Sequence, residues 1–554
     1  MSIRGLSLVG LAVTALAIAF IAANAEHGPI FWTLLTEHDD PAAWVTGAIL
    51  LVGVFAARDE ADWAERLVAA LDRNRYFVAA GLWVLLAAGS IFVYRNHPLS
   101  MDEYAAVFQA RVFAAGQLHG QFPPELFDYL IPHNFQNQFL MVNRGTGAVF
   151  SAYWPGFSLI LTPFVYLGIP WACNATIVAL SLLLIRRLTR DIVEGATAPG
   201  WAMLLAIASP AFVVNGISYY SMPSHLLANL AFAWLLIAPT QGRLVLAGIA
   251  GGCALVLHNP FPHAVFALPW ILWLAVRTAG GNVPQRIRDL GLLALGYLPI
   301  VLLLGVGWTL WQRHALQIGF ESLAANSGLA ASAVAIGDRL ASVIAGLVQH
   351  FRLPDQDLAI ARVAGLVKLF LWGSPVLLLL AWTGGRRAQN EMLRLCFDSA
   401  LLTFFAYFVI PFDQGHGWGY RYFHSAWGVL PILAAAGVAQ IRGASEPWVF
   451  NRLAMMLLAS LLIANGLRVY QVGVFVDKHL SQRPPQTAGR QIVFHNGVGY
   501  YANDLIQNDP WLRGETVMLL SGRPRAESTL LQRYFPGEYV ARSNRYGTSY
   551  TQLP

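Results

Sequence analysis

The sequence predicts an all-α polytopic membrane protein with about 13 transmembrane helices and a small C-terminal α/β extracytoplasmic domain. Of its 554 residues, 56% are hydrophobic and only 12% are charged. Soluble globular proteins carry roughly a quarter charged residues, so this chain has too few to cover a surface facing water. Apolar runs recur along most of its length, as bilayer-spanning helices require. These observations exclude a soluble multidomain enzyme and a disordered, collagenous or coiled-coil protein.

The apolar runs define the expected spans, although several are shorter than the roughly 20 residues that usually cross a bilayer. They lie near residues 5–24, 41–57, 76–94, 170–185, 200–214, 223–238, 244–257, 263–276, 290–310, 363–383, 395–411, 425–441 and 453–472. We therefore divide the chain into three parts. Residues 1–75 hold two N-terminal transmembrane helices and a cytoplasmic amphipathic segment, residues 76–472 form the transmembrane core with a long outer loop at 95–169, and residues 473–554 form the extracytoplasmic domain.

The distribution of arginine predicts the orientation of the spans. With the N-terminus inside, the inner loops collect arginines such as Arg186 and Arg187, whereas the longer outer loops hold fewer basic residues. This asymmetry predicts a cytoplasmic N-terminus and an external C-terminal domain. It also accounts for the net charge of +6 without a nucleic-acid partner. Residues 23–25 (Ala-Asn-Ala) resemble a signal-peptide cleavage site, so cleavage of the first span stays open.

Two adjacent carboxylates, Asp102 and Glu103, follow the third expected span and begin a predicted helix at 101–116. Ser100 and Glu103 match a capping box, which explains Glu103 structurally. A carboxylate at the membrane–water boundary is also suited to accept a proton from a hydroxyl or to hold a metal ion. Both interpretations stay open for the pair.

Aromatic residues and histidines mark two further outer segments. Tyr153 and Trp154 precede a short apolar stretch at 156–168, which we interpret as an interfacial or re-entrant helix. Both side chains are also typical of an interfacial aromatic belt. His258 and His263 flank a short turn and are candidates for binding a phosphate or a metal. The alternative is that both histidines are satisfied by the backbone of the turn.

A glycine-rich polar segment at 413–421, ending in Tyr420 and Arg421, lies between two apolar runs. Its glycines let the backbone approach a ligand closely, although a plain turn with an outward-reaching Arg421 is the alternative. Lys368 lies inside an expected span, where it either reaches the interface or faces a cavity.

Two outer segments remain. Residues 311–362 read as partly helical and amphipathic. In the tail, residues 491–495 and 515–520 predict strands, and residues 498–507 and 525–534 predict short helices.

The order of these features resembles the GT-C superfamily of polytopic glycosyltransferases, of the protein mannosyltransferase and aminoarabinose transferase type. The resemblance extends from about residue 76 to 554. It rests on Asp102-Glu103 after a span, Tyr153-Trp154-Pro155-Gly156 before an apolar helix, Arg186-Arg187 at a basic helix end, Ser209-Pro210 at a bend, the run from Tyr219 to His225, and Gly419-Tyr420-Arg421-Tyr422 at the start of a span.

This resemblance implies transfer of a sugar from a polyprenyl-phosphate donor to a hydroxyl of a glycan, lipid or protein acceptor, at the outer face of the bacterial inner (plasma) membrane. It implies Asp102 as catalytic base, Glu103 as a supporting acid or metal ligand, and Arg421 as the partner of the lipid phosphate. Tyr420, His258, His263 and Tyr153 are the further candidates for donor binding. A divalent metal is the one candidate cofactor.

The sequence also departs from the family pattern. Two spans precede the usual first one, Ser224-His225 stands where relatives often have an acid, and histidines stand at 258–263 where a basic residue is common. A transporter or flippase of lipid-linked glycans is the first alternative function, and a non-enzymatic membrane assembly factor whose tail binds partners is the second. Transporters often show inverted repeats and buried charges at mid-membrane, and the sequence shows no internal repeat.

Overall fold

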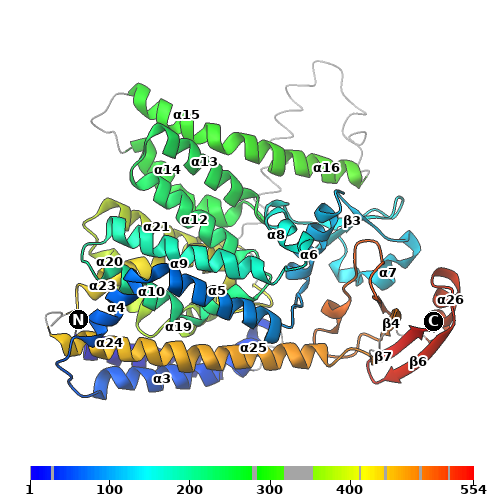
Figure 1. The fold of residues 1–554 in the computed structure, drawn as a ribbon, viewed down its shortest axis with the longest axis horizontal. Helices are drawn as coiled ribbons and strands as arrows, with labels where there is room; N and C mark the ends of the chain where they lie inside the picture. The colour runs from blue at the N-terminus through cyan, green and yellow to red at the C-terminus, as the bar shows by residue number, and fades with distance from the viewer. Residues whose placement is uncertain are drawn as a thin grey trace.

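The computed structural model describes residues 2–25, 30–276, 283–316, 354–410, 414–441, 446–485, 489–521 and 524–553. A long helical bundle occupies most of the molecule, and two small β-sheets lie together at one end of it (Figure 1). The expected segment at 311–362 falls mostly outside the described residues. Within them it contributes parts of two helices, one ending at Ala315 and one beginning at Gln356.

The first half of the chain contains most of the bundle and the loop that follows α5. Its helices are α1 (Ile3–Ala23), α2 (Ile30–Leu34), the π-helical turn η1 (Leu35–Asp39), α3 (Asp40–Phe55), α4 (Trp63–Arg73), α5 (Arg75–Phe92), α6 (Met101–Ala114), η2 (Pro124–Leu126), α7 (Phe127–Leu130), η3 (His133–Phe135), α8 (Gly156–Tyr166), α9 (Ala172–Ile192), α10 (Ala198–Ile207), α11 (Pro210–Ile217), α12 (Met222–Ile237), α13 (Gln241–Val256) and α14 (Phe261–Val276).

The second half completes the bundle and adds the C-terminal domain. Its helices are α15 (Val283–Ile300), η4 (Val301–Gly307), α16 (Trp308–Ala315), α19 (Gln356–Leu371), α20 (Leu377–Arg386), α21 (Glu391–Ala406), η5 (Tyr407–Val409), α22 (Arg421–Trp427), α23 (Val429–Val438), α24 (Pro447–Ala459), η6 (Ser460–Ala464), α25 (Asn465–Leu480), η7 (Ala502–Leu505) and α26 (Pro524–Tyr534).

Two small sheets complete the fold. The loop after α5 forms a three-stranded antiparallel sheet in the order β1 (Gly120–Gln121), β3 (Ala148–Ser151), β2 (Leu140–Val142). The C-terminal domain forms a four-stranded sheet in the order β5 (Thr516–Leu520), β4 (Gln491–His495), β7 (Gly547–Gln552), β6 (Tyr539–Asn544). β4 and β5 are parallel, with Val493 opposite Met518, and the other pairs are antiparallel.

Six helices among the described residues are long and apolar enough to cross a membrane, or seven if the bent pair α10–α11 is one span. Two of the six are continuous rods, Val283–Ala315 and Pro447–Leu480, which contain two of the expected spans. Others of the 13 expected spans correspond to shorter apolar helices, among them α12, α13 and α14. Within the described residues, fewer helices therefore meet this length and composition test than the 13 expected spans, and the number of spans stays a prediction.

Two local expectations are corrected by the structure. The run at 363–383 is broken into α19 and α20, because Ser374-Pro375 interrupts the helix and Val376 adopts a positive φ of 61°. In the tail, the helix expected at 498–507 shrinks to η7, since Gly499 and Tyr501 both have positive φ. The strands β6 and β7 were not expected, because their side chains are mostly polar and half-exposed.

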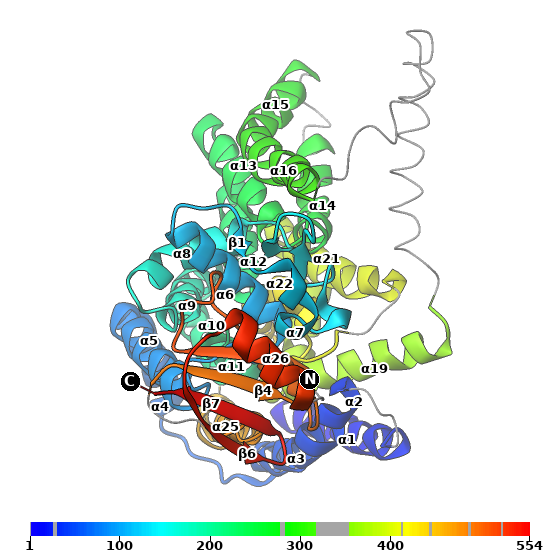
Figure 2. The same cartoon turned by 90° about the vertical axis from the view of Figure 1, so that its right-hand side faces the viewer.

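The C-terminal domain shares a hydrophobic core with the loop after α5. Tyr104 and Phe108 of α6 lie in one buried cluster with Ile492 and Phe494 of β4 and Val517 of β5. Figure 2 shows this end of the molecule, where the C-terminal sheet lies near α6 and α7. The two parts therefore pack together around α6.

Candidate active site

The two adjacent carboxylates at the start of α6 face different surroundings. Glu103 is fully buried, and it accepts hydrogen bonds from the backbone N–H groups of Leu99 (2.7 Å), Ser100 (3.2 Å) and Tyr219 (2.8 Å). The Tyr94 hydroxyl donates a fourth bond at 3.0 Å. The expected capping box is confirmed. Burial raises the pKa of Glu103 to about 7, against the lowering effect of these hydrogen bonds.

Asp102, by contrast, points toward Arg421, which lies 319 residues further along the chain and begins α22. Both terminal nitrogens of the Arg421 guanidinium lie 3.1 Å from Asp102 Oδ2, and the Tyr153 hydroxyl donates to Oδ1. The Asp102 side chain keeps 22% of its surface exposed and that of Arg421 keeps 8%. Burial raises the pKa of Asp102, but the charge of Arg421 and the Tyr153 hydrogen bond outweigh it and hold that pKa below its usual range.

The glycine-rich segment shapes the position of Arg421. Gln414 binds both ends of the residue, because its side-chain oxygen accepts from the Arg421 backbone N–H at 2.8 Å and its carbonyl oxygen accepts from the guanidinium. Gly417 has a φ of 145°, and a Cβ there would overlap the Arg421 side chain. The ring of Tyr220 lies under the guanidinium at 4.5 Å, a cation–π contact. The glycines thus make room for a folded arginine.

The rings of Tyr153 and His258 lie together beside Asp102, in addition to the contact that Tyr220 makes with Arg421. Their rings are 3.8 Å apart between centroids, and the backbone N–H of Trp154 donates to the His258 carbonyl at 3.2 Å. Burial lowers the pKa of His258 to about 4, with Asp102 acting in the opposite direction. At neutral pH His258 is therefore an uncharged imidazole, which can donate one hydrogen bond and accept another but does not act as a fixed cation.

Two predicted donor-binding residues lie outside this group. His263 is buried within α14, where its ring nitrogens bond to Asn229 and to the Tyr297 hydroxyl, each at 2.6 Å. Tyr420 packs its ring against Gly365 of α19 and Phe404 of α21. The structure therefore brings together Asp102, Tyr153, His258 and Arg421, and places His263 and Tyr420 in the packing of the helices.

Three residues that we did not single out for the site also belong to it. The Tyr220 hydroxyl lies 3.0 Å from Ser100 Oγ and 2.7 Å from His416 Nδ1, which joins the start of α6 to the glycine-rich segment. Asp504, from the C-terminal domain, accepts from the Met101 backbone N–H at 2.8 Å. The adjacent Tyr219 and Tyr220 before α12 could have indicated that Tyr220 belongs to the site. No local signal indicates Asp504, which lies 403 residues from Met101.

The carboxylate pair does not suit a metal ion. Glu103 already accepts four hydrogen bonds and faces the interior, so it does not converge with Asp102 on a common point. Within the described ranges, His, Cys, Asp and Glu form no group of three or more that could hold a metal. We therefore derive no chemical step through a metal.

This arrangement places a carboxylate, a guanidinium and two aromatic walls at the start of α6, in a helical membrane bundle with a β-rich end. No family model matches the chain, and no curated protein matches it. The fold defines its class: the chain is a multi-pass membrane protein with a GT-C-like fold.

The likeness is to solved structures of ArnT, an aminoarabinose transferase, from Cupriavidus metallidurans. The structure of ArnT bound to undecaprenyl phosphate is similar with a TM-score of 0.52 and 11% sequence identity, over 86% of this chain and 97% of that one. The apo structure gives a TM-score of 0.50 at the same identity and coverage. At this identity the comparison establishes the fold.

Proposed function

We propose that this protein is a membrane glycosyltransferase that moves a sugar from a polyprenyl-phosphate donor to an acceptor hydroxyl, with Asp102 as the base. The observation that carries the proposal is the ion pair between Asp102, in the first turn of α6, and Arg421, with both N–O distances at 3.1 Å. The Asp102 carboxylate can serve as the base for the acceptor hydroxyl, and the Arg421 guanidinium supplies positive charge for the leaving phosphate. The fold shared with ArnT, whose structure was solved with undecaprenyl phosphate, agrees with a lipid phosphate as part of the donor.

In the proposed reaction, the acceptor hydroxyl loses its proton to a carboxylate oxygen of Asp102. The acceptor oxygen forms a bond to the anomeric carbon of the donor sugar, and the bond between that carbon and the phosphate oxygen breaks. The electron pair leaves with the polyprenyl phosphate, whose added negative charge is stabilised by Arg421. Tyr153 orients Asp102, and the neutral His258 packs against Tyr153.

The ion pair suggests how donor binding prepares the base. Arg421 lowers the pKa of Asp102 and so makes it a weak base while the two are paired. A donor phosphate that takes over the guanidinium leaves Asp102 without its cation. The pKa of Asp102 then rises, and the carboxylate gains affinity for the acceptor proton only when donor is present.

We further propose that this site lies at the outer membrane face, with a cytoplasmic N-terminus and an external C-terminal domain. The arginine-rich loops support this orientation. The site lies among the N-terminal ends of α6 and α22 and the C-terminal domain. Its residue Tyr220 bonds through its carbonyl to Asn174 at the start of α9, whereas Arg186 and Arg187 lie toward the other end of that helix. Cysteine labelling of intact cells tests it, because a cysteine introduced at the exposed Arg513 should react with an impermeant maleimide and one at the exposed Arg387 should not.

A transporter of lipid-linked glycans remains the second candidate, because one observation favours it: Asp39, Lys368 and Arg468 are charged and buried within the bundle. A transferase consumes its donor, whereas a flippase only moves it. The deciding experiment uses purified protein in nanodiscs with a panel of undecaprenyl-phosphate sugars and crude acceptor lipids. Release of undecaprenyl phosphate that depends on Asp102 supports the transferase, and full release by D102N and D102A proteins that fold normally refutes it.

A further inference from the structure

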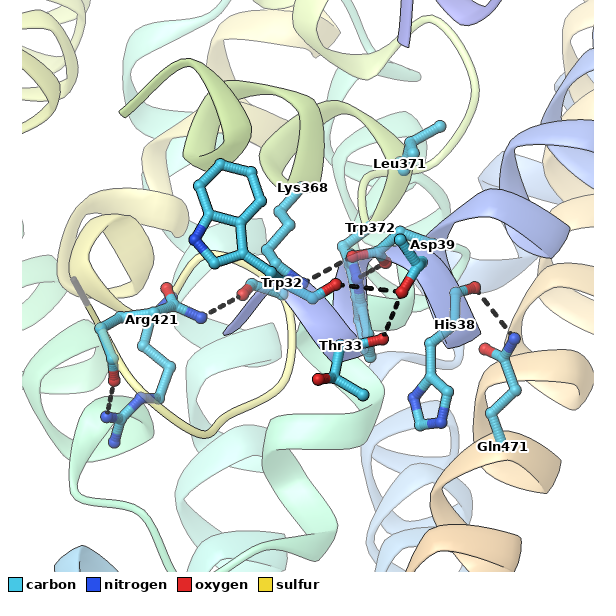
Figure 3. Close-up of polar contacts among 12 residues, drawn as sticks. Trp32, Thr33, His38, Asp39, Lys368, Leu371, Trp372, Arg421 and Gln471 are labelled. Atoms are coloured by element: carbon cyan, nitrogen blue, oxygen red, sulfur yellow. Dashed lines mark hydrogen bonds and ion pairs between the residues drawn. The ribbon is translucent and has the colours of Figure 1, made fainter. Parts of the chain in front are cut away.

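A cluster of buried charges lies within the helical bundle, and Figure 3 shows two of its members, Asp39 and Lys368, together with Trp372 and Arg421. Asp39 of η1 lies 2.6 Å from the Lys368 ammonium of α19 and 2.8 Å from the Arg468 guanidinium of α25. No side chain of the three exposes more than 2% of its surface. Lys368 therefore neither reaches the interface nor faces a cavity. One anion thus neutralises one of two buried cations, inside a bundle where charged groups are expensive.

The anion of this cluster comes from the N-terminal hairpin of α1 and α3, the part of the chain that precedes the GT-C-like region. The hairpin joins its two helices through α2 and η1, and Asp39 is the last residue of that π-helical turn. π-Helical turns inside α-helices are frequent at functional sites. The cations come from the later helices α19 and α25, so the core of the bundle depends on the hairpin for its counter-charge.

Asp39 also holds Trp372, which packs against the glycine-rich segment. The Trp372 indole donates to Asp39 Oδ1 at 2.6 Å, and the Arg468 guanidinium lies 4.1 Å from its ring. The other side of Trp372 is within 3.4 Å of the position that a Cβ on Gly419 would take. Gly419 has a φ of 68°, a backbone conformation that favours glycine. Arg421 is two residues further on.

A second contact joins the hairpin to the same segment. The ring of His38 stacks on Trp418 at 6.0 Å, and the His38 carbonyl accepts hydrogen bonds from Arg468 and Gln471, each at 2.9 Å. On its far edge, the Trp418 indole donates to the Tyr94 hydroxyl at 3.0 Å, and Tyr94 in turn donates to Glu103. Trp418 is thus held between the hairpin and the start of α6, with Asp102 next to Glu103.

We propose that Asp39 is a positioning residue, which through Trp372 and Trp418 holds segment 414–421 so that Arg421 faces the donor phosphate. The N-terminal hairpin is then part of the donor site and more than a membrane anchor. This inference rests on the proposed function. Its structural content is the hydrogen bond from Trp372 to Asp39, the contact between the rings of Trp372 and Trp418 at 6.4 Å, and the stacking of His38 on Trp418. It assigns no chemistry to Asp39 itself.

The test compares D39N and W372F with D72N in nanodiscs. Asp72 pairs with Arg186 at 2.5 Å, between α4 and α9 and remote from segment 414–421, so D72N is a matched carboxylate control. D39N leaves two cations without an anion and is the variant least able to fold. W372F keeps the charges and removes the indole donor together with part of the buried ring, so it tests the same contact in a protein with an intact ion pair.

Three quantities are measured for each variant: the melting temperature, the Kd for undecaprenyl phosphate, and the hydrogen exchange of amides in 414–421. We expect about tenfold weaker binding and faster exchange of 414–421 for D39N and W372F, since small displacements of a binding group have effects of this order or larger. D72N should change neither quantity. In the R421A background, D39N should weaken binding no further, because Asp39 acts through Arg421.

Unchanged binding and unchanged exchange in a folded W372F protein overturn the proposal, as does an additive loss in D39N/R421A. A loss of melting temperature with normal binding identifies the cluster as structural only and also overturns it. If R421A itself binds undecaprenyl phosphate as well as wild type does, the proposed donor site is wrong. Exchange of 414–421 in D39N and W372F then decides alone whether Asp39 positions the segment.

Discussion

Replacing Asp102 with asparagine should have opposite effects on catalysis and on lipid binding. The amide is nearly the same size as the carboxylate and keeps an oxygen that can accept from Arg421 and a group that can bond to Tyr153. D102N therefore removes the charge and the basicity while preserving the shape of the site. Loss of the base slows the transfer, and loss of the negative charge frees Arg421 for a phosphate.

The size of each effect follows from the geometry. A positioned general base contributes about 10² to 10⁴ in rate, or ~3–5 kcal/mol of barrier. The Asp102–Arg421 pair, with 22% and 8% of the side chains exposed, lies between surface pairs and fully buried pairs. Surface pairs are worth up to ~1 kcal/mol, and breaking a buried one costs ~3–5 kcal/mol. Taking ~1.5 kcal/mol for this pair, D102N should bind undecaprenyl phosphate about tenfold more tightly.

Two assays on the same nanodisc preparation check this prediction: single-turnover release of undecaprenyl phosphate from a donor, and equilibrium binding of undecaprenyl phosphate by native mass spectrometry. Asp128 provides the control, because it pairs with Arg144 at 2.5 Å in the same loop but is 57% exposed. D128N should leave both quantities unchanged. A D102N protein that keeps more than a tenth of the wild-type rate refutes the assignment of the base. Unchanged or weaker binding refutes the competition between Asp102 and phosphate for Arg421.

Three further predictions follow from the same geometry. Y153F removes the hydroxyl that donates to Asp102, so the pKa of Asp102 should rise and the acid limb of kcat/KM should move to higher pH, as measured by a pH–rate profile; an unshifted limb contradicts this role. G417A places a Cβ against the Arg421 side chain and should weaken binding of undecaprenyl phosphate about tenfold, judged against G466A, where a Cβ meets nothing within 4 Å. Burial raises the pKa of Asp504 from 3.8 to about 7, so the folded protein binds more protons than the unfolded chain between those values and loses stability as pH rises through them; D504N should flatten the melting temperature across pH 4–7, and an unchanged slope would show that Asp504 does not titrate there.

How far the site could be predicted differs from residue to residue. Asp102 and Arg421 were both expected in it, because an acid pair at the start of a long outer loop and an arginine at the end of a glycine-rich segment are conspicuous in a chain with few charges. Glu103 was harder to interpret, since a capping glutamate and a metal ligand look the same in sequence. Donor binding by His263 stays a prediction, and its partners Asn229 and Tyr297 could not be foreseen because they come from other helices and no local pattern reveals them.

The pairing of charges around Asp39 could not be predicted from the sequence. Lys368 was conspicuous as a charge in an apolar run, but its partner lies 329 residues away in the hairpin. The second cation that pairs with Asp39, Arg468, lies inside the expected span near 453–472. Pairing over such distances in the sequence is decided by helix packing, and the apolar runs do not show which helices pack against one another.

By itself, the sequence determined that this is a helical membrane protein, where its helices begin and end to within a few residues in most cases, and which few polar side chains were available for chemistry. It did so because hydrophobic periodicity, arginine distribution and turn residues act locally along the chain. Only the tertiary structure decided which of those polar groups meet. Asp102 with Arg421, Asp504 with α6, and Asp39 with Lys368 and Arg468 each join segments hundreds of residues apart, and in a low-dielectric interior such charges are stable only where packing brings their partners to them.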